Sequence, residues 1–311
     1  MVQEDRIKNK VIVVCGPTAS GKSDLALSIA QELETEIVSA DSIAVYKKLD
    51  IGTAKPDVAE RERVKHNLID IVDPTEEFSF AEYEELGLKV LDRLFSEGKI
   101  PVICGGTGYF IDALLYKKSY GNCPKIPKIR AELDKITEEK GAQYLYRLLK
   151  EIDPETALKL SVNDTMRVSR ALEIYYSTGK KKSDIVDENE PRFDFKAMSV
   201  DFEREVLYER INLRVDKMFA EGLVEEVKGL LDSGVSPNAQ SMQGIGYKEI
   251  VSGLSEGLTI EEMKEIVKRN TRRYAKRQIT YFKRTEGLIY LPPEKAFLRA
   301  KEVLRDGRFI D

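Results

Sequence analysis

Eight residues near the N-terminus have the types and the spacing of a phosphate-binding loop. They read Gly16-Pro17-Thr18-Ala19-Ser20-Gly21-Lys22-Ser23, fit the pattern G-x-x-x-x-G-K-[ST], and directly follow the apolar run Val11–Cys15. In such a loop backbone N–H groups turn inward on an anion, Lys22 adds a positive charge, and the Ser23 hydroxyl reaches a magnesium ion carried by the phosphates. A helix over 24–33 would point its positive end at the same place. The loop predicts a phosphate ester as ligand without indicating which bond breaks.

Two further polar side chains lie at predicted strand ends, where they could act on a bound phosphate ester. Asp41 follows the apolar run 36–40, and Thr107 lies in Gly105-Gly106-Thr107-Gly108 behind the run 100–104. In a parallel sheet both would stand near the phosphate loop, and a carboxylate with a hydroxyl can orient and deprotonate an amine. Alternatively, Asp41 caps a helix or holds magnesium, and the glycines only make a tight turn.

No strong strand end carries the carboxylate that hydrolytic phosphate-loop enzymes use to hold magnesium. The run 100–104 ends in Gly-Gly-Thr, and Asp70 and Asp73 are weak substitutes. This pattern argues against a switch GTPase or a motor ATPase. A small-molecule kinase that uses ATP stays open, because Asp41 could accept a hydroxyl proton.

The elements that must position these residues alternate along the chain. Short apolar, β-branched runs predict strands at 11–15, 36–40, 68–72, 100–104, 197–202 and 288–291, mostly separated by helical patterns. Such alternation predicts an α/β protein with a parallel sheet flanked by helices on both faces. With the phosphate loop behind its first strand, this is a P-loop NTPase-like core.

A long stretch in the middle of the chain has no strand signal. Helical patterns fill it at 129–140, 143–151, 154–160 and 165–178, and turn formers border it at Tyr120–Pro124 and 180–191. We therefore expect an all-helical insertion domain at 119–192. The α/β core would comprise 1–118 and 193–311, and its second part would end in long helices.

Composition sets the class of protein. The 311 residues are 42% hydrophobic, enough for a full core, and neither a membrane span nor the apolar core of a signal peptide is present. We expect a cytoplasmic protein that does not bind membranes. Cys15 and Cys104 close apolar runs and are interpreted as core residues. The single histidine, His66, cannot build a multi-histidine site, so Mg²⁺ held by phosphates is the metal we expect.

The net charge of the whole chain is −4, but one segment is strongly basic. Lys268–Arg284 contains eight basic residues and no acidic one. On a helix, one broad face would carry Arg269, Arg272, Arg273, Lys276 and Lys283, and another face Val267, Tyr274, Tyr281 and Phe282. A solvated face normally mixes both signs of charge. The segment therefore predicts a surface that docks a nucleic-acid backbone.

Further motifs follow the phosphate loop in a fixed order. They are Ser39–Ser42, Tyr46, Asp50–Pro56, Leu68–Ile71, Gly105–Gly108, Arg167–Glu173, Arg214–Met218, Gly222–Leu223, Glu225–Val227, Gln243–Glu249 and Tyr274–Gln278. In these motifs the chain closely resembles the bacterial tRNA dimethylallyltransferases, also named tRNA isopentenyltransferases. The resemblance covers about residues 10–292. The runs 50–55 and 275–278 are far more specific than the phosphate loop alone.

The resemblance implies a reaction. A dimethylallyl group would pass from dimethylallyl diphosphate to N6 of adenine 37, beside the anticodon of tRNAs that read codons starting with U. The phosphate loop would hold the diphosphate leaving group, with Mg²⁺ at Ser23 and further charge from Arg214. Asp41 would take the N6 proton, and Thr107 would help to fix the amine. The product would be N6-isopentenyladenosine.

The resemblance also implies a bound tRNA anticodon stem-loop and a flipped adenine that enters a channel. The implied tRNA contacts are Asp41, Ser42, Ile43, Ala44, Thr107, Arg130, Met166, Arg167, Val168, Ser169, Arg170, Gln243, Gly244, Ile245, Gly246, Tyr247 and Lys248, and the basic helix adds Arg272, Lys276 and Arg277. Many members carry glutamine at the position of Ala44, so base contacts there would come from the backbone or from neighbours. We expect a monomer.

Three alternatives differ from this reading in specific features. A kinase has no need of the basic helix, and a non-catalytic, nucleotide-gated RNA-binding module has no need of Asp41 and Thr107 beside a diphosphate cradle. An adenylate isopentenyltransferase that acts on free nucleotides could share every catalytic residue. The helical insertion and Lys268–Arg284 argue against that third alternative.

Overall fold

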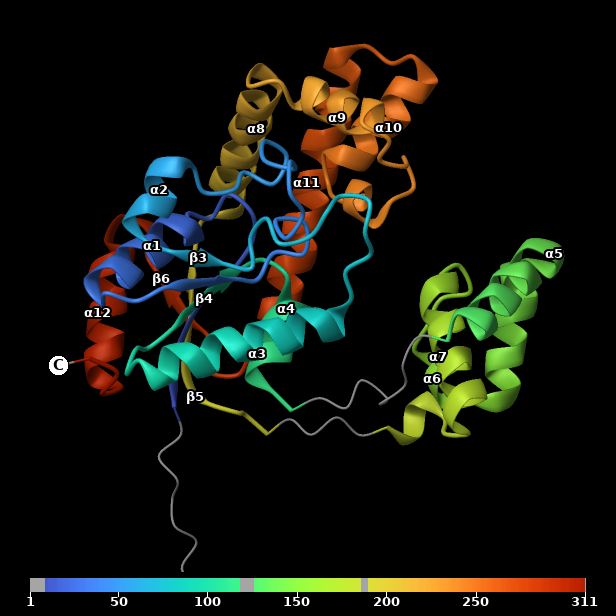
Figure 1. The fold of residues 1–311 in the computed structure, drawn as a ribbon, viewed down its shortest axis with the longest axis horizontal. Helices are drawn as coiled ribbons and strands as arrows, with labels where there is room; N and C mark the ends of the chain where they lie inside the picture. Colours follow the sequence, from blue (N-terminus) through green and yellow to red (C-terminus); the bar gives the residue numbers. More distant parts are fainter. Residues whose placement is uncertain (1–8, 118–125, 186–189, 311) are drawn as a thin grey trace, which may run out of the picture. The chain divides into compact units, whose positions relative to one another are not determined.

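Two compact units make up the described chain (Figure 1). The computed structural model describes residues 9–117, 126–185 and 190–310. One unit, named here the core unit, comprises Met1–Leu115 and Arg192–Asp311, and the other, the helical unit, comprises Tyr116–Pro191. The turn expected at Tyr120–Pro124 lies outside the described residues.

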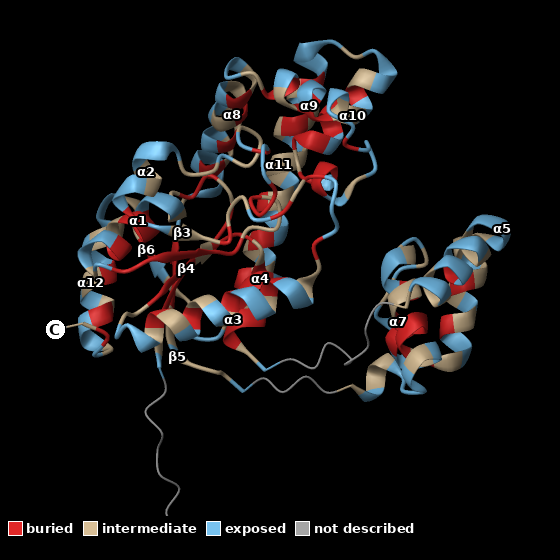
Figure 2. Cartoon of the chain, viewed as in Figure 1, coloured by how far each residue is buried: buried red, intermediate tan, exposed pale blue. Residues whose placement is uncertain are grey.

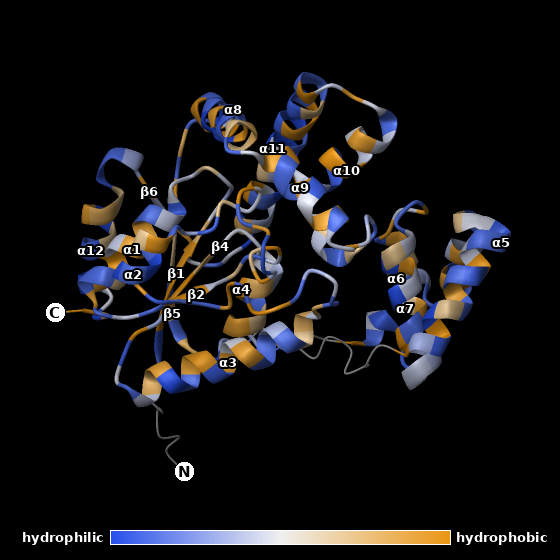
Figure 3. Ribbon diagram, turned by 45° about the horizontal axis from the view of Figure 1, so that its top comes forward, coloured by the Kyte–Doolittle hydropathy of each residue, from blue (hydrophilic) through white to orange (hydrophobic). Residues whose placement is uncertain are grey.

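A parallel sheet forms the centre of the core unit. In the described part of the chain its strands follow the order β3-β2-β4-β1-β5-β6, and all pairings are parallel. Their bounds are β1 Lys10–Cys15, β2 Ile37–Ser39, β3 His66–Asn67, β4 Val102–Gly105, β5 Asp194–Val200 and β6 Ile289–Leu291. The central strands are buried (Figure 2) and hydrophobic (Figure 3), as expected of a parallel sheet covered on both faces. The predicted α/β class is confirmed.

The strand predicted at 68–72 is wrong. The chain pairs with β2 only at His66–Asn67, and Leu68 and Asp70 then take positive φ values of 63° and 56°. Such angles belong to the left-handed region and interrupt a strand. The Asp70 carboxylate instead binds Lys55 and Arg61. A single bridge from Tyr46 to Val72 is all that remains of the predicted pairing.

Helices cover both faces of the sheet and its carboxyl edge. The helices α1 Lys22–Glu32 and α12 Ala296–Asp306 pack together on one face, and α3 Phe80–Ser96 and α4 Gly108–Leu115 pack together on the other (Figure 1). Beyond the carboxyl ends of the strands, α11 packs against α8 and α10, and α9 contacts α8 and α10. Their bounds are α8 Arg204–Ala220, α9 Leu223–Asp232, α10 Tyr247–Glu256 and α11 Ile260–Phe282, while the short α2 spans Val58–Arg63. No described helix is both long and apolar enough to cross a membrane.

The helical unit has a small core of its own. Its helices are α5 Pro127–Ile152, α6 Pro154–Leu158 and α7 Thr165–Thr178. Within α5, Gly141 has φ 78° and ψ 164°, so two helical segments meet there, as the patterns at 129–140 and 143–151 predict. Leucines of α5, including Leu145 and Leu149, pack against Leu172 of α7. This unit therefore buries its apolar residues among its own helices.

Candidate active site

The carboxyl ends of β1, β2 and β4 open into one cavity of about 740 Å³ within the core unit. The β1–β4 register sets Cys15 beside Gly105, and the β2–β4 register sets Ser39 beside Cys104. The loops that follow these strands therefore begin at the same level of the sheet. They carry the phosphate loop, Asp41 and Gly106, all of which line the cavity. The strand ends meet as the sequence predicts.

The phosphate loop has the geometry of an anion cradle. Gly21 adopts a left-handed conformation (φ 76°, ψ 14°) immediately before α1 begins at Lys22. The Lys22 ammonium donates one hydrogen bond, to the Pro17 carbonyl 3.2 Å away. Burial lowers the pKa of Lys22, and the nearby charge of Arg214 lowers it further, whereas Asp41 raises it. A bound anion would stabilise the charged form of Lys22 and so offset the effect of burial on its pKa.

Arg214 lies on α8, lines the same cavity as the phosphate loop, and is half-buried there. Burial is the main cause that lowers its pKa, against the charges of Asp41 and Asp24. One of its terminal nitrogens donates to the Thr53 carbonyl at 3.3 Å, while its buried Nε has no hydrogen-bond partner among the described residues. A buried donor without a partner in a phosphate-type site indicates a missing ligand.

A second arginine, which the sequence analysis missed, lies one turn earlier on α8. Arg210 donates from Nε to the Ala19 carbonyl of the phosphate loop at 2.8 Å and also lines the cavity. Its guanidinium stacks over the Phe202 ring, with 4.6 Å between them. The four-residue spacing from Arg214 places both arginines on one helix face, a signal that the sequence did contain.

Asp41 and Thr107 lie together at the edge of the cradle. Asp41 Oδ1 accepts the N–H groups of Ile43 and Ala44 at 2.9 and 3.2 Å, so one of its oxygens caps a turn, where the alternative expected a helix. Its Oδ2 accepts no hydrogen bond from the described residues. The Thr107 hydroxyl accepts the N–H of Ser42 at 3.3 Å, which joins the two strand ends directly. Thr107 is thus tied to the residue that directly follows Asp41, although its own side chain does not line the cavity.

Tyr274 and Gln278 of α11 complete the wall beside Thr107. The Tyr274 hydroxyl interacts with the side chains of both Thr107 and Gln278, and burial, then the charge of Asp41, raises its pKa to about 12. The buried Gln278 accepts the N–H of Thr18 at 2.9 Å and donates to the Gly106 carbonyl at 3.0 Å. Both lie within the motif 274–278, but the sequence analysis gave neither a role.

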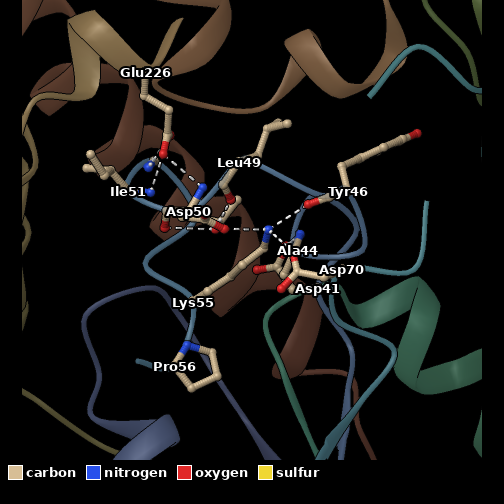
Figure 4. A network of polar contacts seen from close by, with 12 residues as sticks. Asp41, Ala44, Tyr46, Leu49, Asp50, Ile51, Lys55, Pro56, Asp70 and Glu226 are labelled. Atoms are coloured by element: carbon tan, nitrogen blue, oxygen red, sulfur yellow. Dashed lines mark hydrogen bonds and ion pairs between the residues drawn. The ribbon is translucent and has the colours of Figure 1, made fainter. Parts of the chain in front are cut away.

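The motif 50–56 forms part of the cavity wall and is held in place by a network of hydrogen bonds (Figure 4). The Glu226 carboxylate accepts the N–H groups of Asp50, Ile51 and Gly52 at 2.8–3.2 Å, and the Tyr247 hydroxyl at 2.6 Å. A Cβ atom on Gly52 would lie 2.4 Å from the Tyr247 ring, so only glycine fits there. The loop is therefore clamped where Thr53 meets Arg214.

Lys55 ties the other end of this loop to the segment after β3. Its ammonium donates to the Tyr46 carbonyl at 2.5 Å, to Asp50 at 3.0 Å and to Asp70 at 2.7 Å, and its side chain is only 2% exposed. Arg61 binds the second oxygen of Asp70 at 2.6 Å. Asp70, considered above as a weak magnesium ligand, is fully engaged in this network.

The predicted tRNA contacts of the core unit divide into exposed and buried groups. Gln243 and Lys248 are exposed, whereas Ala44 is 5% and Tyr247 0% exposed. Tyr247 uses its hydroxyl on Glu226. The Tyr247 side chain thus belongs to the clamp on loop 50–56, and a tRNA contact at this residue stays a prediction.

The predicted contacts of the helical unit divide in the same way. Met166 is 84% exposed, but Val168 is 1% exposed and its side chain packs in the leucine-rich core, so only its backbone is left for the predicted contact. Arg170 and Arg130 approach the buried Glu173 at 2.8 and 3.7 Å. The remaining predicted contacts are Arg167, which pairs with Asp164 at 3.4 Å, and the half-buried Ser169.

The basic segment forms the second half of α11 and the two residues after it, and its exposed face differs from the predicted one. Lys268 binds Asp216 at 2.7 Å, and Arg272 donates to Asn212 at 2.5 Å, so both turn toward α8. Arg272, which the prediction placed on the basic face, is therefore half-buried against α8, and one lysine of the segment is paired with a carboxylate. Its exposed cations, none paired with a described carboxylate, are Arg269, Arg273, Lys276, Arg277, Lys283 and Arg284.

Ser23 and the cysteines complete the site. Ser23 is exposed at the cavity, and its hydroxyl makes no hydrogen bond with the described residues. Among the described residues no three histidine, cysteine or acidic side chains cluster as a metal site. Cys15 and Cys104 are free thiols whose pKa values burial raises to about 12 and about 11. Their interpretation as core residues agrees with this environment.

Known proteins resemble this chain over nearly its whole length. The family model described as IPP transferase matches residues 44–285. The tRNA dimethylallyltransferase of Acetivibrio thermocellus is 46% identical over 286 residues, 91% of each chain. That of Bacillus licheniformis is 46% identical over 304 residues, 96% of each chain.

Solved structures give the same result. The tRNA isopentenylpyrophosphate transferase of Bacillus halodurans superimposes with a TM-score of 0.71 at 36% identity, covering 96% of each chain. A eukaryotic dimethylallyltransferase, described as acting on tRNA, gives a TM-score of 0.83 at 31% identity over 97% of this chain and 79% of its own. By sequence and by fold, this chain belongs to the IPP transferase family, among the relatives named tRNA dimethylallyltransferase.

Proposed function

We propose that this protein transfers the dimethylallyl group of dimethylallyl diphosphate to N6 of adenine 37 in tRNAs that read codons starting with U. The observation that carries the proposal is the cavity that the phosphate loop and Asp41 line together, with Thr107 bonded to Ser42 at its wall. Family membership favours this reaction over the kinase and over an adenylate isopentenyltransferase.

The donor side of the cavity stabilises a leaving group. As the carbon–oxygen bond of the donor breaks, the electron pair leaves with diphosphate, and negative charge builds on its oxygens. Backbone N–H groups of the cradle, the Lys22 ammonium and the unpartnered Nε of Arg214 are already fixed around that position. Preorganised donors of this kind lower the barrier because they need no reorganisation during the reaction.

The acceptor side removes one proton. N6 of the flipped adenine forms a bond to the carbon that diphosphate leaves, and the proton that N6 loses passes to the free Oδ2 of Asp41. The Thr107 hydroxyl, held by Ser42 and Tyr274, orients the amine. Every atom is then accounted for: the products are N6-dimethylallyl adenine, diphosphate and a proton on the enzyme.

The residues present fit a magnesium ion that arrives with the diphosphate. The exposed Ser23 hydroxyl and the Asp24 carboxylate at the cavity are oxygen ligands, which magnesium prefers. Bound there, the ion would neutralise part of the diphosphate charge. A monomer that binds its tRNA through four exposed cations of α11 and through Lys283 and Arg284, which follow the helix, completes the proposal.

The test supplies magnesium and labelled dimethylallyl diphosphate together with either unmodified tRNA or AMP. We expect label in tRNA alone, at the adenine next to the anticodon, in tRNAs that read codons starting with U. A tRNA with guanosine at that position is the matched acceptor control.

Other results would contradict the proposal in distinct ways. Label in AMP alone would identify an enzyme of free nucleotides. Phosphate transfer from ATP without any prenyl transfer would identify a kinase. Tight tRNA binding without transfer would leave only an RNA-binding module.

A further inference from the structure

The buried carboxamide of Gln278 joins the two halves of the cavity. Its oxygen accepts the Thr18 N–H of the phosphate loop at 2.9 Å, and its nitrogen donates to the Gly106 carbonyl behind β4 at 3.0 Å. Thr18 follows β1 and Gly106 follows β4, and these strands are neighbours in the sheet. Gln278 is 5% exposed, so its two hydrogen bonds do not compete with bulk water.

The surrounding backbone is built to admit this carboxamide. A Cβ atom on Gly106 would lie 2.2 Å from the Gln278 nitrogen, so the bond to the Gly106 carbonyl requires a glycine there. The bond directions also fix the orientation of the amide, because only its oxygen can accept and only its nitrogen can donate. A buried amide that lost one partner would be left with an unsatisfied polar group.

Each hydrogen-bond partner of Gln278 belongs to, or directly precedes, a residue with a proposed role in the reaction. Thr18 belongs to the loop that cradles the diphosphate, and Gly106 precedes Thr107, whose hydroxyl reaches Ser42 and Tyr274. Tyr274, one turn before Gln278 on α11, interacts with both Thr107 and Gln278. A continuous polar chain therefore runs from the leaving-group cradle to the hydroxyl that meets the amine.

We infer that Gln278 is a positioning residue that sets the spacing between the diphosphate cradle and the acceptor side at Thr107. This inference rests on the proposed prenyl transfer. Because carbon–nitrogen bond formation needs the donor carbon and N6 in line at close approach, a shift of about 1 Å between the two loops can lower the rate about 10²-fold. Binding of each substrate depends on its own half of the cavity and should change little.

The test compares Gln278→Met, which keeps the length but loses both hydrogen bonds, with wild type and with Gln240→Met. Gln240 makes the same kind of two-ended contact, to the N–H and C=O of Phe78, but it does not line the cavity. Single-turnover transfer with saturating donor and tRNA is the readout. We expect the rate of Gln278→Met to fall about 10- to 100-fold, with both dissociation constants within about threefold, and Gln240→Met to match wild type.

Two further measurements separate positioning from a merely structural effect. In a Thr107→Ala background the penalty of Gln278→Met should shrink, because residues that act through one another are not additive. If Gln278→Met melts early, Gln278→Glu supplies the second variant: when ionised it keeps an acceptor for Thr18, loses the donor to Gly106 and adds a negative charge beside that carbonyl. Its transfer rate should also fall.

Several outcomes would overturn the inference. They are an unchanged rate in Gln278→Met and Gln278→Glu, a loss explained entirely by weaker donor binding, and penalties that add fully with Thr107→Ala. These failures all require an active wild type. A wild type that transfers nothing to tRNA would instead refute the proposed function, together with this inference.

Discussion

Two sets of polar residues lie side by side in the core unit, and they differ in how completely they are paired. In the network around loop 50–56, Lys55 binds three oxygens and Glu226 accepts four donors. In the cavity, Lys22 makes one hydrogen bond at 3.2 Å and Arg214 leaves its Nε without a described partner. Both sets contain a lysine from a conspicuous motif.

The difference separates a structural role from a binding role. Native proteins satisfy nearly all of their buried polar groups with hydrogen bonds. A network whose groups are all paired within the chain therefore indicates a structural role. Spare donors in a desolvated pocket indicate that a ligand completes them. By this criterion Lys55 and Glu226 hold the loop, whereas we propose that Lys22, Arg214 and Asp41 serve the substrate.

Asp41→Asn should have the largest effect. The amide oxygen can still accept the N–H groups of Ile43 and Ala44, but the side chain can no longer take a proton. Single-turnover transfer should fall about 10²- to 10⁴-fold, the range of general-base contributions, with tRNA affinity within about threefold. The matched control is Asp70→Asn in the paired network, which should lower the melting temperature and spare the rate of the folded fraction. A large loss of tRNA affinity with retained turnover in Asp41→Asn would contradict the base assignment.

Lysine substitutions should give opposite results in the two sets. Lys22→Met should fold at least as stably as wild type, because it removes a charge that burial disfavours, yet lose about 10²- to 10³-fold in transfer rate. Lys55→Met leaves Asp50 and Asp70 without their shared cation and should lower the free energy of unfolding by about 3 kcal/mol, at the low end for broken buried pairs. Denaturant titration and single-turnover transfer measure the two effects. Equal stability losses in both variants would remove the distinction between the sets.

The same contrast extends to α11. Lys276→Glu, on the exposed and unpaired face, should weaken tRNA binding about tenfold and reduce the slope of log affinity against log salt by about 1. Lys268→Met, at a lysine already bound to Asp216 and Glu265, should leave that slope unchanged. Filter binding at several salt concentrations checks both. A slope change in Lys268→Met as large as that in Lys276→Glu would show that pairing does not predict the docking face.

The sequence predicted most of the sheet and the donor half of the site, because both depend on local patterns. Strand periodicity placed Asp41 and Thr107 at strand ends, and the phosphate loop is contiguous in the chain. Contacts between distant segments could not be read in this way: Gln278 meets Thr18 from 260 positions away, and Glu226 meets Asp50 from 176. The motifs 50–56 and 274–278 were recognised, but their purpose depends on these long-range contacts.

Local patterns also misled where tertiary contacts override them. The apolar residues at 68–72 resemble a strand, yet the ion pairs of Asp70 with Lys55 and Arg61 hold that segment in a different conformation. A helical wheel placed Arg272 on the basic face, but the wheel does not show that α8 covers that side. Burial of Tyr247 and Val168 likewise depends on neighbours that are remote in sequence.

The smallest predicted effect is a pH dependence. For Lys22, stability and diphosphate affinity should change in opposite directions as the pH rises. Burial holds the pKa of Lys22 below its ordinary value of 10.5 in the empty protein. Between the lowered value and 10.5 the unfolded chain binds more protons at this residue than the folded chain, so the free energy of unfolding rises with pH. Affinity for inorganic diphosphate should move the opposite way, because the ammonium that attracts it is lost.

Lys22→Met provides the reference, since every other titrating group, including diphosphate itself, is common to both proteins. Across the alkaline range, the diphosphate affinity of wild type relative to Lys22→Met should fall by up to about tenfold per pH unit, the limit for one proton. Over the same window the stability of wild type relative to Lys22→Met should rise. Calorimetric titration and denaturant unfolding at matched pH values measure the two slopes. Slopes of the same sign would mean that Lys22 is paired within the protein, as Lys55 is, and that the cavity does not await an anion.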